Sequence, residues 1–231
     1  MIGITNYIQE KLKITKNTKI INYNYFPKDK EELKEIINKL IDERGDNADL
    51  NDIDTSEIID MSDLFNPQAQ KNSINFFNGD ISRWDVSNVE DMGFIFANSY
   101  FNNDISNWNV SKVINMEEMF SSSKFNQDIS KWNVSNVENM NSMFAYSEFN
   151  GDISKWNVSN VKNMGYMFKK SIFNRDISQW DVSKVKNMKC MFSDSLFNQN
   201  ISKWNVKKVK KMEFIFNNCP LEKNPPSWYH E

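Results

Sequence analysis

Five aspartates recur every 24 residues and are the first side chains whose type and spacing suggest chemistry. They are Asp80, Asp104, Asp128, Asp152 and Asp176, with Asn200 in the sixth place. If successive turns of chain stack at strand spacing, about 4.8 Å, these carboxylates form a row that calcium could bridge. No glycine-rich calcium loop accompanies them, however, and each is followed two residues later by Ser, whose N–H the carboxylate can accept in a tight turn. We therefore expect a structural row without metal.

A second row of polar side chains follows the same interval. Its members are Asn102, Asn126, Asn150, Asn174 and Asn198. Asparagines at equivalent places in stacked turns usually satisfy backbone groups between the turns. We expect that role here rather than ligand binding.

The residues of common catalytic sites are nearly absent. The single histidine, His230, stands beside the C-terminus, and no phosphate-binding glycine loop, nucleophile elbow or metal-ligand cluster is present. A hydrolase that uses only carboxylates has no specific support. Cys219 takes the place of a small Ser in the repeat, so we expect a buried thiol and no disulfide with Cys190. The sequence predicts a protein that is not an enzyme and has no cofactor.

The charges are distributed unevenly along the chain. Nine acidic residues lie between Asp42 and Asp63, against one basic residue, whereas eight lysines lie between Lys184 and Lys211, against one acidic residue. Solubility of exposed ends is the simpler explanation. The functional alternatives are an anionic partner at the basic end and head-to-tail self-association. The candidate partner-binding residues are Lys184, Lys186, Lys189, Lys207, Lys208, Lys210 and Lys211.

A strict repeat must position all of these side chains. The seven tryptophans stand 24 residues apart, at positions 84, 108, 132, 156, 180, 204 and 228. Such spacing indicates a chain that winds through equivalent turns, each of which buries its large residue at the same place. The tryptophans are then committed to the core and cannot stack on bases, so we expect no nucleic-acid partner.

The rest of the unit predicts two short elements in each turn. The Met-x-x-Met-Phe segment, preceded by Asn or Asp, has the spacing of a short capped helix. The segment from Phe125 to Trp132 and its equivalents suit a short strand, stacked in parallel on the next copy. The fold class is therefore α/β, a solenoid of 24-residue turns.

The ends differ from the repeat. We expect an N-terminal cap over residues 1–49, with an amphipathic helix over 30–44, a short helix near 7–13 and a strand near 19–26. The solenoid covers 50–217, with an atypical first turn at 50–65 and an insertion at 66–75. A C-terminal cap covers 218–231, where Pro225 and Pro226 replace the Ile-Ser pair of the repeat.

The unit Phe-Asn-x-Asp-Ile-Ser-x-Trp-Asn-Val-Ser-Asn-Val-x-Asn-Met-x-x-Met-Phe resembles the surface-protein repeat of the BspA-like family, which is common in mucosal bacteria and mycoplasmas. The match is close over residues 76–217 and loose over 50–65 and 218–228. The resemblance implies a right-handed solenoid of the leucine-rich-repeat type and a role in adhesion or protein binding. It also implies a cell-surface location.

The sequence itself favours a different location. No secretory leader pattern and no apolar run of membrane-spanning length is visible, so the default expectation is a cytoplasmic protein without membrane insertion. The leading hypothesis for function is a non-catalytic module that binds a protein partner through the residues that vary between turns. The alternative is a structural protein that assembles through its oppositely charged ends.

Overall fold

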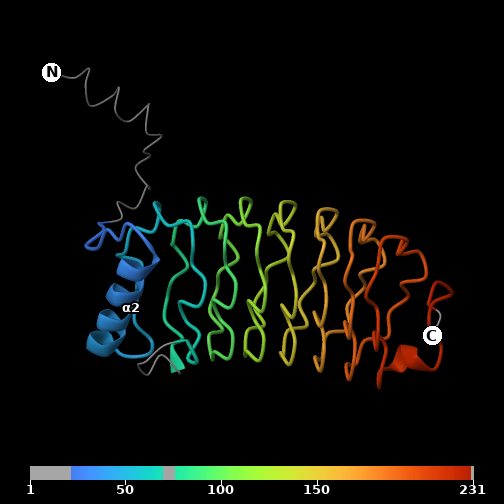
Figure 1. The fold of residues 1–231 in the computed structure, drawn as a ribbon. Coiled ribbons are helices and arrows are strands. Elements are labelled where there is room, and N and C mark those ends of the chain that lie inside the picture. The colour runs from blue at the N-terminus through green and yellow to red at the C-terminus, as the bar shows by residue number, and fades with distance from the viewer. Residues whose placement is uncertain (1–21, 70–75, 230–231) are drawn as a thin grey trace, which may run out of the picture.

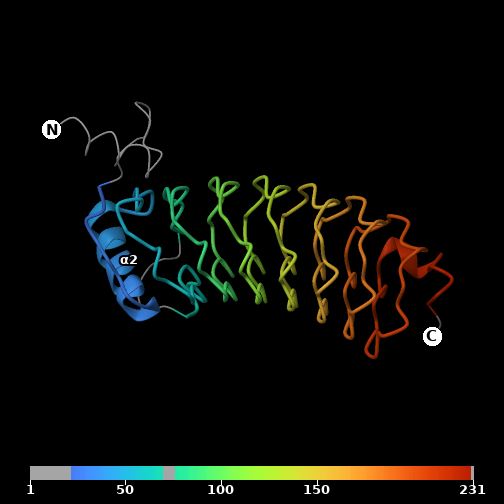
Figure 2. The same ribbon diagram turned by 90° about the horizontal axis from the view of Figure 1, so that it is seen from above.

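The chain folds into a stack of similar turns, which lie side by side along one axis (Figures 1 and 2). The computed structural model describes residues 22–69 and 76–229. Within these ranges the helical elements are α2, Lys30–Arg44, and the 3₁₀-helix η2, Pro220–Glu222. Contacts of the parallel β type within the same ranges are isolated bridges, such as Asn139 with Asn163, rather than continuous strands.

The predicted helix over residues 30–44 is confirmed. The Asp29 side chain accepts the N–H of Glu32 at its start, and Gly45 ends it with φ of 85° while its own N–H reaches the Ile41 carbonyl. Its apolar face, formed by Leu33, Ile37, Leu40 and Ile41, is buried. Helix α2 lies across the N-terminal end of the stack (Figure 1) and its apolar face joins the common core, so it shields the first turn from water.

Parts of the expected caps and insertion lie outside the described residues. These are the helix near 7–13, residues 19–21 of the strand near 19–26, residues 70–75 of the insertion and residues 230–231, including His230. Within the described part, Tyr25 forms a parallel bridge with Ile53 of the atypical first turn. The division into caps and repeat stays a prediction.

Neighbouring turns are joined mainly through the segment that contains the two methionines. Within this segment, every second backbone N–H donates to a carbonyl of the next turn. Around the middle of the stack these bonds are Met140 to Asn163 (2.9 Å), Ser142 to Gly165 (2.8 Å), Phe144 to Met167 (2.9 Å) and Tyr146 to Lys169 (2.7 Å). The remaining N–H groups close tight turns within the segment, as Met143 does with the carbonyl of Met140 at 3.3 Å.

This arrangement differs from the expected helix and strand. In the described ranges the Met-x-x-Met-Phe segments are consecutive turns. Most bridges form at the residue before the first Met, and of the bridges between turns only Asp49 with Asp80 lies in an equivalent of the Phe125–Trp132 segment. The cause is a left-handed residue at two places in each full turn, such as Ser142 with φ of 54° and Tyr146 with φ of 57°. A left-handed residue interrupts helical bonding and directs its N–H toward the next turn. The broader solenoid class stays a prediction.

The tryptophans hold the other side of each turn. Each indole N–H donates to a backbone carbonyl in the preceding turn, and Trp132 bonds to Ile105 at 3.2 Å. The same bond recurs for all seven tryptophans, at 3.0–3.2 Å. The acceptor for Trp84 is Leu50, so Leu50 takes the place that Ile81 has as acceptor for Trp108.

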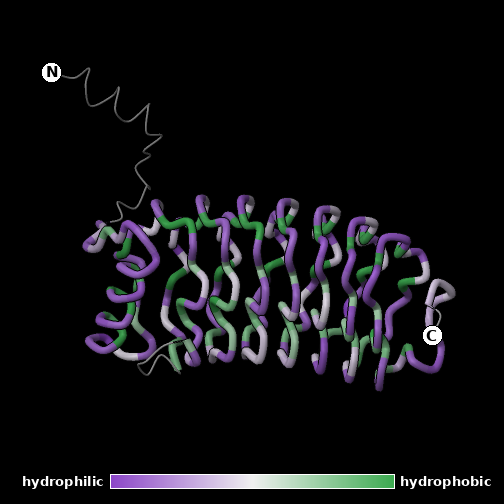
Figure 3. Tube along the Cα trace, viewed as in Figure 1, coloured by the Kyte–Doolittle hydropathy of each residue, from purple (hydrophilic) through white to green (hydrophobic). Residues whose placement is uncertain are grey.

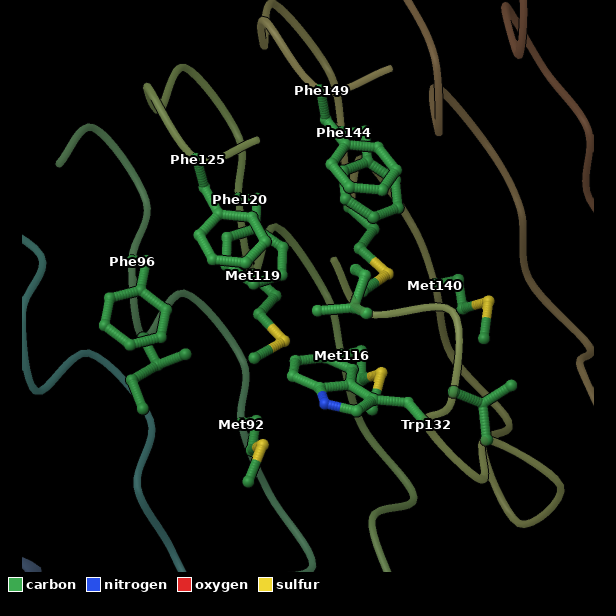
Figure 4. Close-up of a cluster of buried hydrophobic side chains, with 14 of the residues drawn as sticks. Met92, Phe96, Met116, Met119, Phe120, Phe125, Trp132, Met140, Phe144 and Phe149 are labelled. Carbon is green, nitrogen blue, oxygen red and sulfur yellow. The ribbon is translucent and has the colours of Figure 1, made fainter. Parts of the chain in front are cut away.

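Phenylalanines form two continuous stacks through the core. Phe120 lies 5.7 Å from Phe144 of the next turn, between ring centres, and 4.1 Å from Phe125 of its own turn. Figure 4 shows this pairing repeated in Phe144 and Phe149, with methionine side chains filling the space beside the rings. Because the same residues point inward in each turn, hydrophobic and hydrophilic residues alternate similarly along the stack (Figure 3). The result is one elongated core.

We expect Trp132→Ala to lower the free energy of unfolding by about 3–5 kcal/mol, because it leaves a cavity and removes one of the two hydrogen bonds that the Ile105 carbonyl accepts. Trp228→Ala is the matched control at the end of the stack, where the same side chain is only partly buried and the loss should be smaller. Urea denaturation followed by circular dichroism measures both. Equal losses at the two positions would contradict this account.

The left-handed backbone gives a second expectation. Ser122 is exposed and has φ of 55°, where a side chain costs about 1–2 kcal/mol that glycine avoids. After the greater freedom of glycine in the unfolded chain is subtracted, Ser122→Gly should raise the free energy of unfolding by about 0.5–1 kcal/mol. Lys131→Gly, at an exposed residue without positive φ, should lower it instead, as thermal unfolding of both variants can check.

Candidate interaction surface

The aspartate row is built from turns, as the sequence indicates. Each carboxylate accepts the N–H of the Ser two residues later, at 2.8–2.9 Å, and Asn200 does the same at 3.0 Å. Two further turns of this kind occur in the same coil, at Asn133 with Ser135 and at Asn139 with Asn141. The expected Asp-to-Ser bond is therefore confirmed. Each turn has three corners fixed by short polar side chains except the last, where Lys211 replaces the third.

These bonds also lower the pKa values of carboxyl groups in the row. The backbone N–H of Ser106 is the main cause that lowers the pKa of Asp104, while the neighbouring Asp128 and Asp80 act in the opposite direction. The pKa of Asp128 and that of Asp152 are lowered by the same type of bond. Because the folded pKa is depressed, the stabilising contribution is present above the ordinary pKa of Asp and is lost as the pH falls through the folded value. Bonded N–H groups thus offset the mutual repulsion.

The asparagine row satisfies the backbone between turns. The side-chain oxygen of Asn102 accepts the N–H of Asn126 at 2.9 Å, and Asn126 does the same for Asn150. The bond recurs at Asn174 and Asn198, at 3.0 and 2.9 Å. This prediction is confirmed, and it occupies the side-chain oxygens of Asn102, Asn126, Asn150 and Asn174.

The cysteine thiols and the side chains that could bind a metal ion do not form a reactive site in the described part of the chain. Cys219 is free and buried, as expected, and burial raises the pKa of its thiol; Cys190 is also free and buried. Among the described residues, no three His, Cys, Asp or Glu side chains are grouped to hold a metal ion. Likewise, no helix in the described part of the chain is long and apolar enough to cross a membrane.

The seven candidate lysines, Lys184, Lys186, Lys189, Lys207, Lys208, Lys210 and Lys211, are brought onto two neighbouring turns. We call them the lysine surface. The N–H of Lys210 donates to the carbonyl of Lys186 at 2.8 Å, so these two residues lie directly one above the other. Lys211 forms a parallel bridge with Asn187 in the same place. All seven are exposed except Lys189, which is half-buried.

The charges of the lysine surface are not neutralised by ion pairs among the described residues. Within the described ranges, none of its seven members lies within ion-pair distance of a carboxylate. Lys184 donates to the side chain of Asn160 at 2.7 Å, which orients it without removing its charge. Sequence reasoning missed Lys162, which continues the row below Lys186 but is paired with Glu138 at 2.6 Å.

The acidic end is different, because several of its charges are already paired. Arg44 binds Asp52 at 2.9 Å and thereby lowers the pKa of that carboxyl group. Lys30 binds Asp60 at 2.9 Å, and Arg83 lies 3.8 Å from Asp49. The two ends are therefore not equivalent as binding surfaces.

The variable positions differ in how far they face outward. The residue before each tryptophan varies between turns and is exposed, at positions 83, 107, 131, 155, 179 and 203. Within the methionine segments the outcome is mixed, since Gly93, Gly165 and Cys190 are buried. A Cβ atom on Gly165 would lie 2.7 Å from the side-chain nitrogen of Asn187, so the neighbouring turn limits that position.

The fold and this surface define a repeat protein in which repeated residues build a rigid stack and variable residues cover it. The chain belongs to the family described as "Mycoplasma protein of unknown function, DUF285", whose family model matches residues 32–148 and 122–228. The two overlapping matches span the first turn to the last. No curated protein and no solved structure matches the chain.

We expect calcium to leave the melting temperature unchanged, because each carboxylate of the aspartate row already accepts a backbone N–H. Asp128→Asn should retain its turn, as Asn200 does, and change the free energy of unfolding by no more than about 0.5 kcal/mol. Differential scanning calorimetry with calcium and with chelator tests both variants. A calcium-dependent rise in the wild type that Asp128→Asn removes would overturn the structural role.

Proposed function

We propose that this protein is a non-catalytic protein-interaction module of the BspA-like type, with a stack of the leucine-rich-repeat class. The observation that carries the proposal is the lysine surface: a group of uncompensated charges held on a rigid frame. Rigid presentation favours binding because little conformational entropy is lost by the backbone on association.

The separation of buried core residues from exposed variable residues supports this proposal. The tryptophans are only 3–4% exposed through the middle of the stack, and the phenylalanine stacks are fully buried. Side chains that hold the core are therefore unavailable to a ligand, whereas the residues that differ from turn to turn are mostly at the surface. Repeat proteins characteristically build extended binding surfaces from such residues.

The charge of the lysine surface indicates the chemistry of the partner. An acidic protein surface would gain favourable contacts there and would be attracted over a distance of about 8–10 Å at physiological salt. A nucleic acid is the less suitable partner, because the tryptophans that could stack on bases are enclosed. We therefore propose an acidic protein as the partner, in adhesion or as a scaffold.

A second candidate function is self-assembly through the two ends. The excess of acidic residues near the N-terminus and of lysines near the C-terminus favours it. Head-to-tail contacts would be open-ended and sensitive to salt. The internal pairing of Asp52 and Asp60 reduces the charge available at the acidic end, so we rank this candidate second.

The first proposal can be tested by affinity capture from mycoplasma extracts with the full chain as bait. The wild type should retain an acidic protein, and a variant with Lys184, Lys186, Lys208 and Lys210 all changed to Gln should retain at least about tenfold less of it, a loss of 1.4 kcal/mol or more in binding. The matched control changes Lys28, Lys112, Lys131 and Lys155 to Gln, which alters the net charge equally at exposed sites in other turns. Capture of no partner, or equal loss in both variants, would contradict the proposal.

A further inference from the structure

The residue that precedes the second buried Phe of each repeat, such as Phe125, belongs to a separate row on the surface of the stack. Its members, which we call the outer row, are Phe76, Tyr100, Lys124, Glu148, Ile172 and Leu196. The four apolar side chains are unusually exposed: Phe76 by 58%, Tyr100 by 52%, Ile172 by 45% and Leu196 by 59%. Single exposed apolar residues are common, but an aligned series of them is typical of an interaction surface.

Contacts between turns show that the row is continuous. The rings of Phe76 and Tyr100 lie 5.2 Å apart, and Lys124 forms an ion pair with Glu148. Further along, the N–H of Leu196 donates to the carbonyl of Ser171, the residue before Ile172, at 3.3 Å. Adjacent members thus occupy adjacent turns, in the order aromatic, aromatic, Lys, Glu, aliphatic, aliphatic.

This order is self-complementary when it is reversed. We propose that a second copy of this chain packs side by side and antiparallel along the outer row, about a two-fold axis between Lys124 and Glu148. Lys124 then faces the partner's Glu148, Tyr100 faces the partner's Ile172, and Phe76 faces the partner's Leu196. The two-fold axis makes each contact twice, as expected for a closed dimer of identical chains.

Other arrangements of the same two rows are unfavourable. A parallel pairing places Lys124 against the partner's Lys124 and Glu148 against the partner's Glu148, and like charges in contact repel. An antiparallel pairing displaced by one turn again opposes the two copies of Lys124 and buries Tyr100 against the partner's Glu148. The pattern of side chains therefore selects both the direction and the register.

The rows on either side of the outer row are compatible with this register. On one side Asn98 approaches the level of the partner's Lys170, and Ser122 that of the partner's Tyr146. On the other side Asn103 approaches the level of the partner's Arg175. None of these pairs joins like charges. Four residues beyond the outer row, Asp128 comes level with the partner's Asp152, so the contact must end before the aspartate row.

The inference is independent of the proposed function. Lys184 is separated from Leu196 by half of a 24-residue turn, so the dimer leaves the lysine surface available. An antiparallel dimer presents its two lysine surfaces toward opposite ends. The closed dimer also differs from head-to-tail assembly, which would continue into longer oligomers and weaken with salt.

Sedimentation velocity of the full chain over a range of concentrations tests the apolar contacts. We expect a dimer that forms no larger species and that persists in about 1 M salt, where the screening length is only about 3 Å. Leu196→Ser should raise the dimer dissociation constant by at least about tenfold. Ile59→Ser is the matched control, because Ile59 is 58% exposed but lies outside the outer row, and it should leave that constant unchanged.

A mixing experiment tests the register. Lys124→Glu places two acids opposite two acids, and Glu148→Lys places two bases opposite two bases, so each variant alone should be monomeric. An equimolar mixture should restore the dimer, since each acid then faces a base in the other chain although neither chain has its internal ion pair. Wild-type monomers at every concentration, dimers in all the variants, or no recovery on mixing would overturn the proposal.

Discussion

The structure depends on the bond from each tryptophan indole to a carbonyl in the preceding turn. A buried N–H without an acceptor would cost about 1–3 kcal/mol, and the indole ring itself supplies a large apolar surface. Ring and bond together require each turn to lie directly above the last. This spacing brings equivalent residues of successive turns into contact. The phenylalanine rings can then stack, and the asparagine side chains can bond to the next turn. The 24-residue interval is thus the consequence of a repeated contact, and each deviation from it is confined to an end or an insertion.

Much of this could be predicted from the sequence, because it depends on local patterns or on identity between repeats. The capped helix over residues 30–44, the turn at each Asp-x-Ser and the burial of Cys219 are of this kind. The left-handed residues could not be predicted, since Ser142, Tyr146 and their equivalents are not glycine. Their conformation is imposed by bonds to the next turn, which a local pattern does not contain. The same spacing of Met and Phe that suits a helix also suits a chain of tight turns with one face inward.

The candidate site shows a similar limit. Lysines that are close in sequence were identified readily, whereas Lys162 and the outer row consist of residues 24 apart that differ in chemical type. In the stack, residues 24 apart in sequence become neighbours on the surface. Residues of different chemical type at these positions therefore lie in a fixed order along the stack. The structure also shows that the acidic and basic ends of the chain differ in how many of their charges are paired. Asp52 and Asp60 have basic partners, and the lysine surface has none among the described residues, so the basic end carries the stronger field.

A rigid stack that pairs with its own copy would alter how the lysine surface acts. Two such surfaces, fixed at opposite ends of an antiparallel dimer, can engage two acidic sites whose separation matches the length of the stack. The second contact is then intramolecular, and its effective concentration depends on geometry rather than on the bulk concentration of the partner. Weak individual contacts would suffice for strong attachment to a repetitive acidic surface, and a single isolated acidic protein would be held only weakly. The outer row and the lysine surface would then act together: one sets the spacing and the other makes the contact.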